Sequence, residues 1–538
     1  MVNEVKEEPN IPDSPSPVTS FYLSLNIQVP TGGDTRSTTE NTDPSDSSDG
    51  TLPAAANENI IESAQLYFFN ADDPHEQLCK IMAYKKPTIV GKDNEWTVTA
   101  KVEPDELREL MGKTVNLYVF ANPYNYYYQS SDRKEAGFQG SSFDISGLNG
   151  RPVQPFGEGE DGQLCPMANR DMFTIDAFKE MPKDVKSDRE ILAAVSSIFN
   201  KEYTAPDGTE GMLWNVENSE QKTQLILERQ IARVDYKDGS TIAGKPFLYK
   251  LPDAKYYKED GTEEEVYLKI MSMQLFNIDK EAYTMRHTQR ISSDGAESNL
   301  TIFGREKDNS NDQDYNWMAD YNWLNKKSGI FNGYNPYRTL SGTDALISSE
   351  DLERWEDKYF HTSGNEYVPW HYLMENTLPS TDKMTLDLAT GVVFNVALCN
   401  ANGSPIEGEE DTFKRIIMSN GKYQDVRYKR EVTKQVTIFE GDEEVSELKE
   451  ISPAGYYLTY NYLIEHNRET GNTVNGSTGT QSTIAPMQIG IVRNNVYQLS
   501  VTDIKNLPNP EDPEDLTIEI KIQVLPWGLR VDDNVILK

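Results

Sequence analysis

The sequence has few of the residues that bind metals or form disulfides. It contains three cysteines and five histidines among 538 residues. Cys79, Cys165 and Cys399 lie far apart, without the paired spacing of a zinc site, and the histidines show no HxxxH spacing. An odd number of cysteines also excludes a fully paired disulfide framework. We therefore predict three buried thiols (the alternative is one disulfide plus one free thiol), and no metal or cofactor.

The sequence also lacks signatures of catalysis and of a membrane-spanning helix. No apolar run approaches the length that crosses a bilayer, and neither a Gly-x-Ser-x-Gly motif nor a P-loop occurs. Carboxylates are spread so widely that no pair stands out as general acid and base. The alternating acidic residues of 308–314 are similar to part of a calcium loop, but the glycine and final glutamate are missing. We interpret them as an ordinary loop and predict that the protein is not an enzyme.

Positive charge is scarce. Lysine and arginine number 52 against 87 aspartates and glutamates, which gives a formal net charge of −35. Such a surface repels phosphate backbones, so we expect no nucleic-acid partner. The length of the chain exceeds that of one ordinary domain, and we expect two.

What the sequence does contain is strict alternation of apolar and polar residues at both ends. This period of two is the signature of a half-buried strand. Near the start, the apolar positions are Phe21, Leu23, Leu25, Ile27 and Val29. Near the end, one alternating strand covers 516–525, and after Pro526 the alternation resumes at Trp527, Leu529, Val531, Val535 and Leu537. A terminal strand without a partner invites pairing with another chain.

Between these ends, strand patterns dominate. Short β-branched and aromatic runs recur, separated by turn signals, for example at 115–121, 225–234, 266–276 and 391–398. Helices are predicted only over short segments, at 104–111 and after the capping box Ser187-Asp188-Arg189-Glu190. This pattern predicts a mainly β protein built from β-sandwiches.

Aromatic residues gather in two polar segments. Asp-Tyr-Asn-Trp occurs at 314–317 and again at 320–323, and four tyrosines lie within 124–128. Aromatic rings flanked by asparagine and aspartate can stack on sugars or dock a protein partner. The alternative, which we favour, is that they pack over one end of a sandwich.

Several short motifs, in this order, resemble those of the fimbrillins, the structural subunits of type V pili of Bacteroidia. The motifs lie at 66–69, 115–122, 165–169, 227–234, 372–376, 492–497 and 524–527. The resemblance implies two transthyretin-like β-sandwich domains with a few short helices. It also implies a cell-surface protein of the fimbrium, made as an outer-membrane lipoprotein precursor. The lipobox cysteine of such precursors is absent from the start of this sequence.

The resemblance further implies a mechanism of assembly. An arginine-specific protease cuts after the residue that matches Arg36, before Ser37, and the first strand is removed. The C-terminal strand of another subunit then fills the groove. The implied partners are other copies of the chain, anchor and tip subunits of the pilus, the protease, and host or bacterial surface ligands.

We accordingly divide the chain into a tether with a removable strand (1–36), an N-terminal sandwich (37–238) and a C-terminal sandwich (239–538) that ends in a donor strand (527–538). The alternative function is a monomeric or tip adhesin, or a glycan-binding lipoprotein, with the same β-sandwich fold. In a further alternative the C-terminus docks within its own chain.

Overall fold

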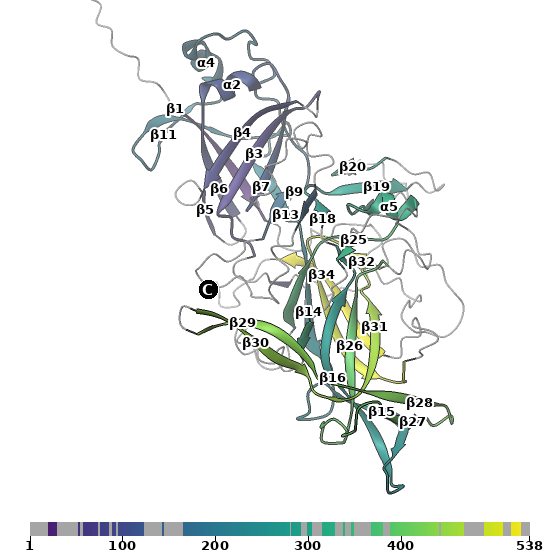
Figure 1. Ribbon diagram of the computed structural model, residues 1–538. Coiled ribbons are helices and arrows are strands. Elements are labelled where there is room, and N and C mark those ends of the chain that lie inside the picture. Colours follow the sequence, from purple (N-terminus) through teal and green to yellow (C-terminus); the bar gives the residue numbers. More distant parts are fainter. Residues whose placement is uncertain are drawn as a thin grey trace, which may run out of the picture.

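The computed structural model places most of the chain. The described residues are 20–29, 52–53, 58–73, 76–84, 89–92, 95–122, 142–144, 165–279, 281–291, 299–303, 315–328, 337–338, 346–348, 367–379, 388–440, 443–466, 489–508 and 518–528. Strands dominate these residues and the helices are short (Figure 1), so the predicted mainly β class is confirmed. Among them, no helix is both long and apolar enough to cross a membrane.

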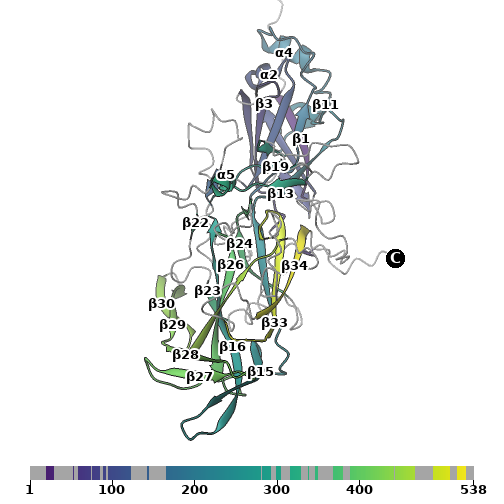
Figure 2. The same cartoon turned by 90° about the vertical axis from the view of Figure 1, so that its right-hand side faces the viewer.

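The apolar side chains form two large cores, one above the other along the long axis of the molecule (Figure 2). The N-terminal core draws almost all of its residues from 21–231, and the C-terminal core draws its residues from 232–507. Two residues from the C-terminal half, Met374 and Val496, pack into the N-terminal core. Residues from both halves of the chain therefore contribute to the N-terminal core.

One large set of paired strands surrounds the N-terminal core. Its main path runs β11-β12-β1-β13-β9-β7-β3-β4, with β6 paired to β1, β5 to β6 and β10 to β7. The bounds are β1 (Ser20–Gln28), β3 (Ser63–Asn70), β4 (Gln77–Tyr84), β5 (Ile89–Lys92), β6 (Glu95–Val102), β7 (Val115–Ala121), β9 (Met167–Asn169), β10 (Phe173–Ile175), β11 (Lys201–Thr204), β12 (Glu210–Asn215) and β13 (Gln224–Arg229).

Two further sheets enclose the C-terminal core. A five-stranded sheet has the order β2 (Leu52–Pro53), β34 (Ile518–Gly528), β33 (Asn495–Ile504), β14 (Ala232–Asp238) and β24 (Val368–Leu373). A seven-stranded sheet has the order β15 (Leu248–Tyr257), β27 (Phe413–Ile417), β28 (Tyr423–Lys429), β31 (Gly455–Leu463), β26 (Gly391–Cys399), β16 (Glu263–Phe276) and β23 (Leu346–Ser348). Because β15 also pairs with β16, six of these strands form a closed circuit, which protects their edges.

Small sheets complete the fold. They pair β17 (Ile278–Asp279) with β22 (Tyr337–Arg338), β18 (Glu281–Tyr283) with β8 (Ser142–Asp144), β25 (Asn376–Thr377) with β32 (Gly490–Ile491), β29 (Val432–Glu440) with β30 (Glu443–Ser452), and β19 (His287–Ile291) with both β20 (Thr301–Ile302) and β21 (Tyr315–Met318). The helices are α2 (Pro104–Leu110), α4 (Asp188–Val195) and α5 (Trp323–Ser328).

The helix-capping residues predicted from the sequence form their caps in the structure. The Ser187 hydroxyl accepts a bond from the Glu190 amide at 3.4 Å, and the Glu190 carboxylate accepts one from the Ser187 amide at 3.2 Å. This capping box starts α4, which buries Ile191 and Val195. Gly112, with φ of +71°, follows α2 in the left-handed conformation that favours glycine.

The segment 225–234, expected as one strand, is two strands that belong to different sheets. β13 pairs with β1 and β9 around the N-terminal core, whereas β14 pairs with β24 and β33 around the C-terminal core. Gln230 and Ile231 make the crossing between them. Periodicity could not show this break, because the strand remains buried on both sides of it. The domain bounds themselves stay a prediction.

All three cysteines are buried and free. Burial raises the pKa of each thiol, that of Cys399 to about 12. The thiolate is the reactive form, so these thiols should be inert in the folded protein.

We expect no reaction of the buried thiols with a chromogenic disulfide reagent at pH 8 in buffer. In guanidinium chloride, three thiols per chain should react. A fast-reacting thiol in the native protein would contradict the packing described here.

Candidate functional site

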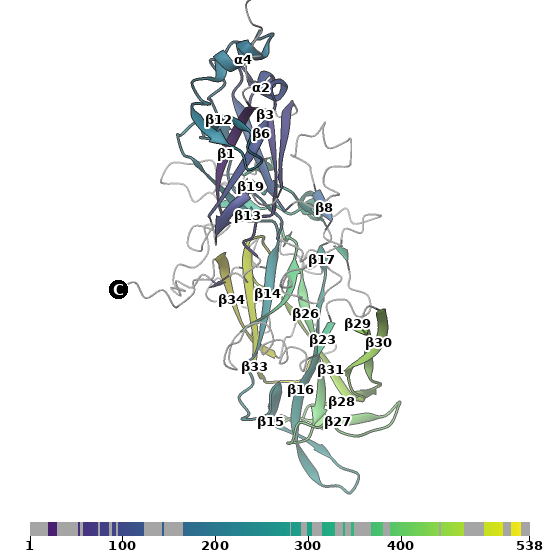
Figure 3. The ribbon, with the colours of Figure 1, turned by 90° about the vertical axis from the view of Figure 1, so that its left-hand side faces the viewer.

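The predicted removable strand, β1, lies inside the sheet and not at its edge. On one side it pairs antiparallel with β6, from Phe21 opposite Val102 to Gln28 opposite Glu95. On the other side it pairs parallel, first with β12 and then with β13. Figure 3 shows β1 crossing the N-terminal half between β6 and β12. The backbone of β1 therefore completes hydrogen-bonding ladders on both sides.

One face of β1 fills the N-terminal core. The ring of Phe21 meets that of Phe199 at 5.2 Å between centroids, and Phe199 in turn contacts Trp214 at 5.8 Å. The five predicted apolar residues are exposed by 3% or less: Phe21, Leu23, Leu25, Ile27 and Val29. Each such side chain contributes about 1.5–3 kcal/mol when fully buried. The core is thus incomplete without this strand.

Polar contacts fix the register of β1 on its other face. The Thr97 hydroxyl donates to the Asn26 side-chain oxygen at 3.0 Å, and the Tyr22 ring lies 4.8 Å from that of Tyr203. Opposite the start of the strand, a Cβ on Gly211 would lie 2.3 Å from the carbonyl oxygen of Ser20. Glycine at 211 therefore permits the close approach of β12 to β1.

The predicted cleavage site and the predicted donor strand are described only in part. β34 continues to Gly528, past the end expected at residue 525, and Trp527 pairs with Leu52 of β2. Trp527 thus belongs to the last described strand of its own sheet. The other predicted site residues lie outside the described residues: Arg36, Ser37, Leu529, Val531, Val535 and Leu537. Their roles as cleavage site and donor strand stay predictions.

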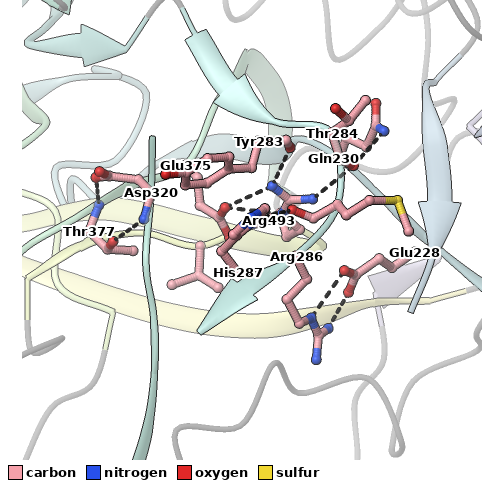
Figure 4. A network of polar contacts seen from close by, with 12 residues as sticks. Glu228, Gln230, Tyr283, Thr284, Arg286, His287, Asp320, Glu375, Thr377 and Arg493 are labelled. Atoms are coloured by element: carbon pink, nitrogen blue, oxygen red, sulfur yellow. Dashed lines mark hydrogen bonds and ion pairs between the residues drawn. The ribbon is translucent and has the colours of Figure 1, made fainter. Parts of the chain in front are cut away.

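A network of buried charges joins the two cores (Figure 4). Arg493, fully buried just before β33, donates to the Glu375 carboxylate at 2.9 and 3.1 Å. It also donates to the Tyr283 carbonyl at 2.7 Å, while Gln230, from the crossing between β13 and β14, donates to the Thr284 carbonyl at 2.8 Å. Residues from both halves thus converge on the segment that contains residues 283 and 284.

A second part of the network surrounds Glu58, which is also fully buried. Its carboxylate accepts bonds from Arg233 at 2.9 and 3.0 Å and from the Tyr372 hydroxyl at 2.6 Å. Burial raises the pKa of Tyr372, so its hydroxyl keeps the proton that it donates. Arg229 of β13 donates to the Glu58 carbonyl at 3.2 Å and to the Asn494 side chain at 3.1 Å. The chain downstream of the predicted cleavage site is thereby held between the cores.

Further buried ion pairs complete the junction. Arg286 pairs with Glu228 of β13, and Lys326 of α5 pairs with Asp320. Trp323 is buried and donates to the Gln289 side chain at 2.8 Å. For Trp323, packing is thus the correct interpretation of the repeated Asp-Tyr-Asn-Trp motif. The side chains of residues 315–317 and the tyrosines of 124–128 lie outside the description.

This junction explains what three of the sequence motifs do. The motifs at 227–234, 372–376 and 492–497 each supply a buried charged residue to it: Arg229, Glu375 and Arg493. The partners of these motifs, Glu58, Arg286 and Lys326, could not be predicted from the motifs themselves. The available signal was the presence of charges inside apolar strand patterns, as at Glu228 and Arg229.

The junction and β1 differ in what they hold together. Among the described residues, no group of three or more His, Cys, Asp or Glu side chains could hold a metal ion. The charged side chains of the junction pair with one another and are buried. β1 occupies a strand-shaped position in the N-terminal core, and β34 lies in the five-stranded sheet of the other half.

Removal of one partner from a buried ion pair should be costly. We expect Glu375→Gln to lower the free energy of unfolding by about 3–5 kcal/mol, because Arg493 would keep its charge in the interior without a counterion. Glu265→Gln, which removes the exposed partner of Lys250, is the matched control and should leave stability unchanged. Urea unfolding of both variants measures the difference. Equal stabilities would show that loss of the Glu375 charge does not destabilise the junction.

One family model matches the C-terminal part of the chain. Residues 456–533 match the family described as major fimbrial subunit protein type IV, fimbrillin, C-terminal. The match spans β31 to β34 and three of the predicted donor residues, and it confirms the resemblance to the fimbrillins over this segment. None of the curated proteins matches the chain.

The solved structures that match this chain include three from two bacteria. The tip fimbrial protein Mfa3 of Porphyromonas gingivalis, with a C-terminal truncation, is 11% identical, with a TM-score of 0.34 over 94% of this chain and 100% of its own. A putative cell adhesion protein of Parabacteroides distasonis is 10% identical, with a TM-score of 0.40 over 95% and 99%. A fimbrial assembly protein of the same organism is 11% identical, with a TM-score of 0.24 over 94% and 99%. At these identities and TM-scores, the structural similarity supports no conclusion about function.

Proposed function

We propose that this chain, which carries a fimbrillin C-terminal region, is a structural subunit of a type V pilus at the cell surface. It assembles by donor-strand exchange and supports adhesion and biofilm formation. In this proposal the chain is exported as an outer-membrane lipoprotein precursor, and an arginine-specific protease cuts it after Arg36. Its partners are other copies of itself and the anchor and tip subunits of the pilus.

The observation that carries the proposal is the position of β1. The strand lies at the N-terminal end of the described chain, yet it is an interior strand with ladders on both sides. Its loss would expose unpaired backbone groups of β6, β12 and β13 together with five empty side-chain positions in the core. An added strand from another molecule satisfies both needs at once, which is β-augmentation.

The C-terminal tail has the pattern to fill that slot. Five apolar positions leave with β1, and five arrive with Trp527, Leu529, Val531, Val535 and Leu537. Asp533 is the one break in the series. At roughly 25 cal/mol per Å² of apolar area, burial of that many side chains is worth on the order of 10 kcal/mol before the cost of ordering the tail. Because the slot and the tail are different surfaces, each insertion leaves a new slot and a new tail, and a filament results.

Limited proteolysis tests this mechanism. We expect trypsin treatment of the full-length chain to convert monomers into filaments, seen by size-exclusion chromatography and electron microscopy. An Arg36→Ala variant under the same conditions should stay monomeric. A chain that ends at Trp527 should be cut but not polymerise, because it has lost four of the five donor residues.

A synthetic peptide of residues 527–538 sharpens the test. Added in excess during proteolysis, it should occupy the slots and shorten or abolish the filaments. If the cut chain stays monomeric, or if the truncated chain still polymerises, the donor assignment is wrong. A cut chain that stays monomeric would favour a monomeric or tip adhesin.

A further inference from the structure

The end of the molecule farthest from α4 carries an exposed aromatic surface on the outer side of the closed sheet. It lies on β15, β27 and β28, at the bottom of Figure 1. Tyr257, Phe413 and Tyr423 are 47%, 60% and 61% exposed. They are three of the eight large apolar or aromatic side chains that stand exposed among the described residues.

The strand register places these rings on one face. Ile416 and Val426 point into the C-terminal core, so their neighbours along each strand point outward. Arg415 lies opposite Asp425, and Phe413 lies opposite Arg427. Tyr256 lies inward opposite Ile416, so Tyr257 is outward beside Arg415. We name this surface the distal aromatic face; it consists of Tyr257, Phe413, Arg415, Tyr423 and Asp425.

The polar groups of the face are held in place. Both oxygens of Asp425 accept bonds from the Arg415 guanidinium, at 2.7 and 2.8 Å. This bidentate pair holds the guanidinium 4.2 Å from the centre of the Tyr423 ring. On the neighbouring strand, Glu263 accepts bonds from the Tyr257 hydroxyl at 2.8 Å and from Lys255 at 2.6 Å. The face therefore has planar rings and hydrogen-bonding groups side by side.

The basic side chains on the face and at its border are each paired with a carboxylate, and the chain as a whole carries −35. Arg415 pairs with Asp425, Arg427 with Asp411, and Lys255 with Glu263. A polyanion would be repelled by the chain and would find no surplus of positive charge here. A ligand that fits is uncharged, with apolar faces to stack on rings and hydroxyl groups to bond with fixed carboxylates and guanidinium. Sugars have this chemistry, because a pyranose ring presents C–H faces and a rim of hydroxyls.

The dimensions also favour a few units of an extended polymer over a second copy of the chain. Three strands at about 4.8 Å spacing, by four residues along a strand, cover on the order of 150 Å². A stable protein–protein contact buries about 800 Å² on each partner. Moreover, β1 and the end of β34 lie elsewhere, in the upper and middle parts of the molecule (Figures 1 and 3). Strand exchange thus leaves the face open.

We propose that the distal aromatic face binds a neutral polysaccharide. This binding is independent of strand exchange and requires only the C-terminal half of the folded chain. The rings provide the stacking surface, and Arg415 with Asp425 provides the polar anchor between them.

Affinity gel electrophoresis of the full-length chain tests the proposal, since the acidic protein migrates well in native gels. The probes are mannan, dextran and galactan, with polygalacturonate as the anionic comparison. We expect at least one neutral polymer to retard the chain. Tyr257→Ala combined with Tyr423→Ala should weaken that binding at least tenfold, whereas Tyr257→Phe, which keeps the ring, should retain most of it.

Leu324→Ala is the matched control, because Leu324 is similarly exposed (55%) on α5, away from the face. It should bind as the unaltered chain does, and thermal unfolding should show that all variants are folded. The proposal is overturned if no neutral polymer retards the chain, if the double variant binds equally well, or if polygalacturonate alone binds. It is also overturned if sedimentation shows self-association that the double variant abolishes. The chain that ends at Trp527 should still bind, so failure here is distinguishable from failure of strand exchange.

Discussion

The structure depends on charges buried between two apolar cores. Glu58, Arg229, Glu375 and Arg493 are all fully buried, and isolated charges in such places are prohibitively costly. Each is acceptable only while its partner from another part of the chain is in place. The two cores must therefore be built and docked together before these groups are satisfied. This requirement ties the crossing between β13 and β14, the segment before β33, and the chain around Glu58 to one arrangement.

That arrangement has a consequence for assembly. The slot filled by β1 belongs to the N-terminal core, and β34 belongs to the five-stranded sheet of the C-terminal half. Because the junction holds the two cores together, slot and C-terminal strand have a defined relation within one subunit. Glu58 also anchors the chain downstream of the predicted cleavage site. Loss of residues 1–36 would leave this anchor in place. In a filament made by strand exchange, each subunit would then repeat the same geometry.

The two proposed binding activities depend on different kinds of surface. Strand exchange uses an interior position, where backbone hydrogen bonds and five buried side chains act together. The distal aromatic face is exposed, charge-balanced and remote from the junction. A subunit with both could be joined to its neighbours through one region and hold a surface ligand through the other, without competition between them.

Local features of the fold could be predicted from the sequence. Alternation at 21–29 showed which face of β1 is buried, the capping box at 187–190 started α4, and strand patterns indicated the mainly β class, because these depend on neighbours along the chain. Pairing between distant segments makes β1 an interior strand and divides 225–234 between two sheets. It also brings Glu58 to Arg233, which is 175 residues away. Partners so distant leave no periodic trace in the sequence, since a buried charge shows that it needs a counterion but not where that counterion lies.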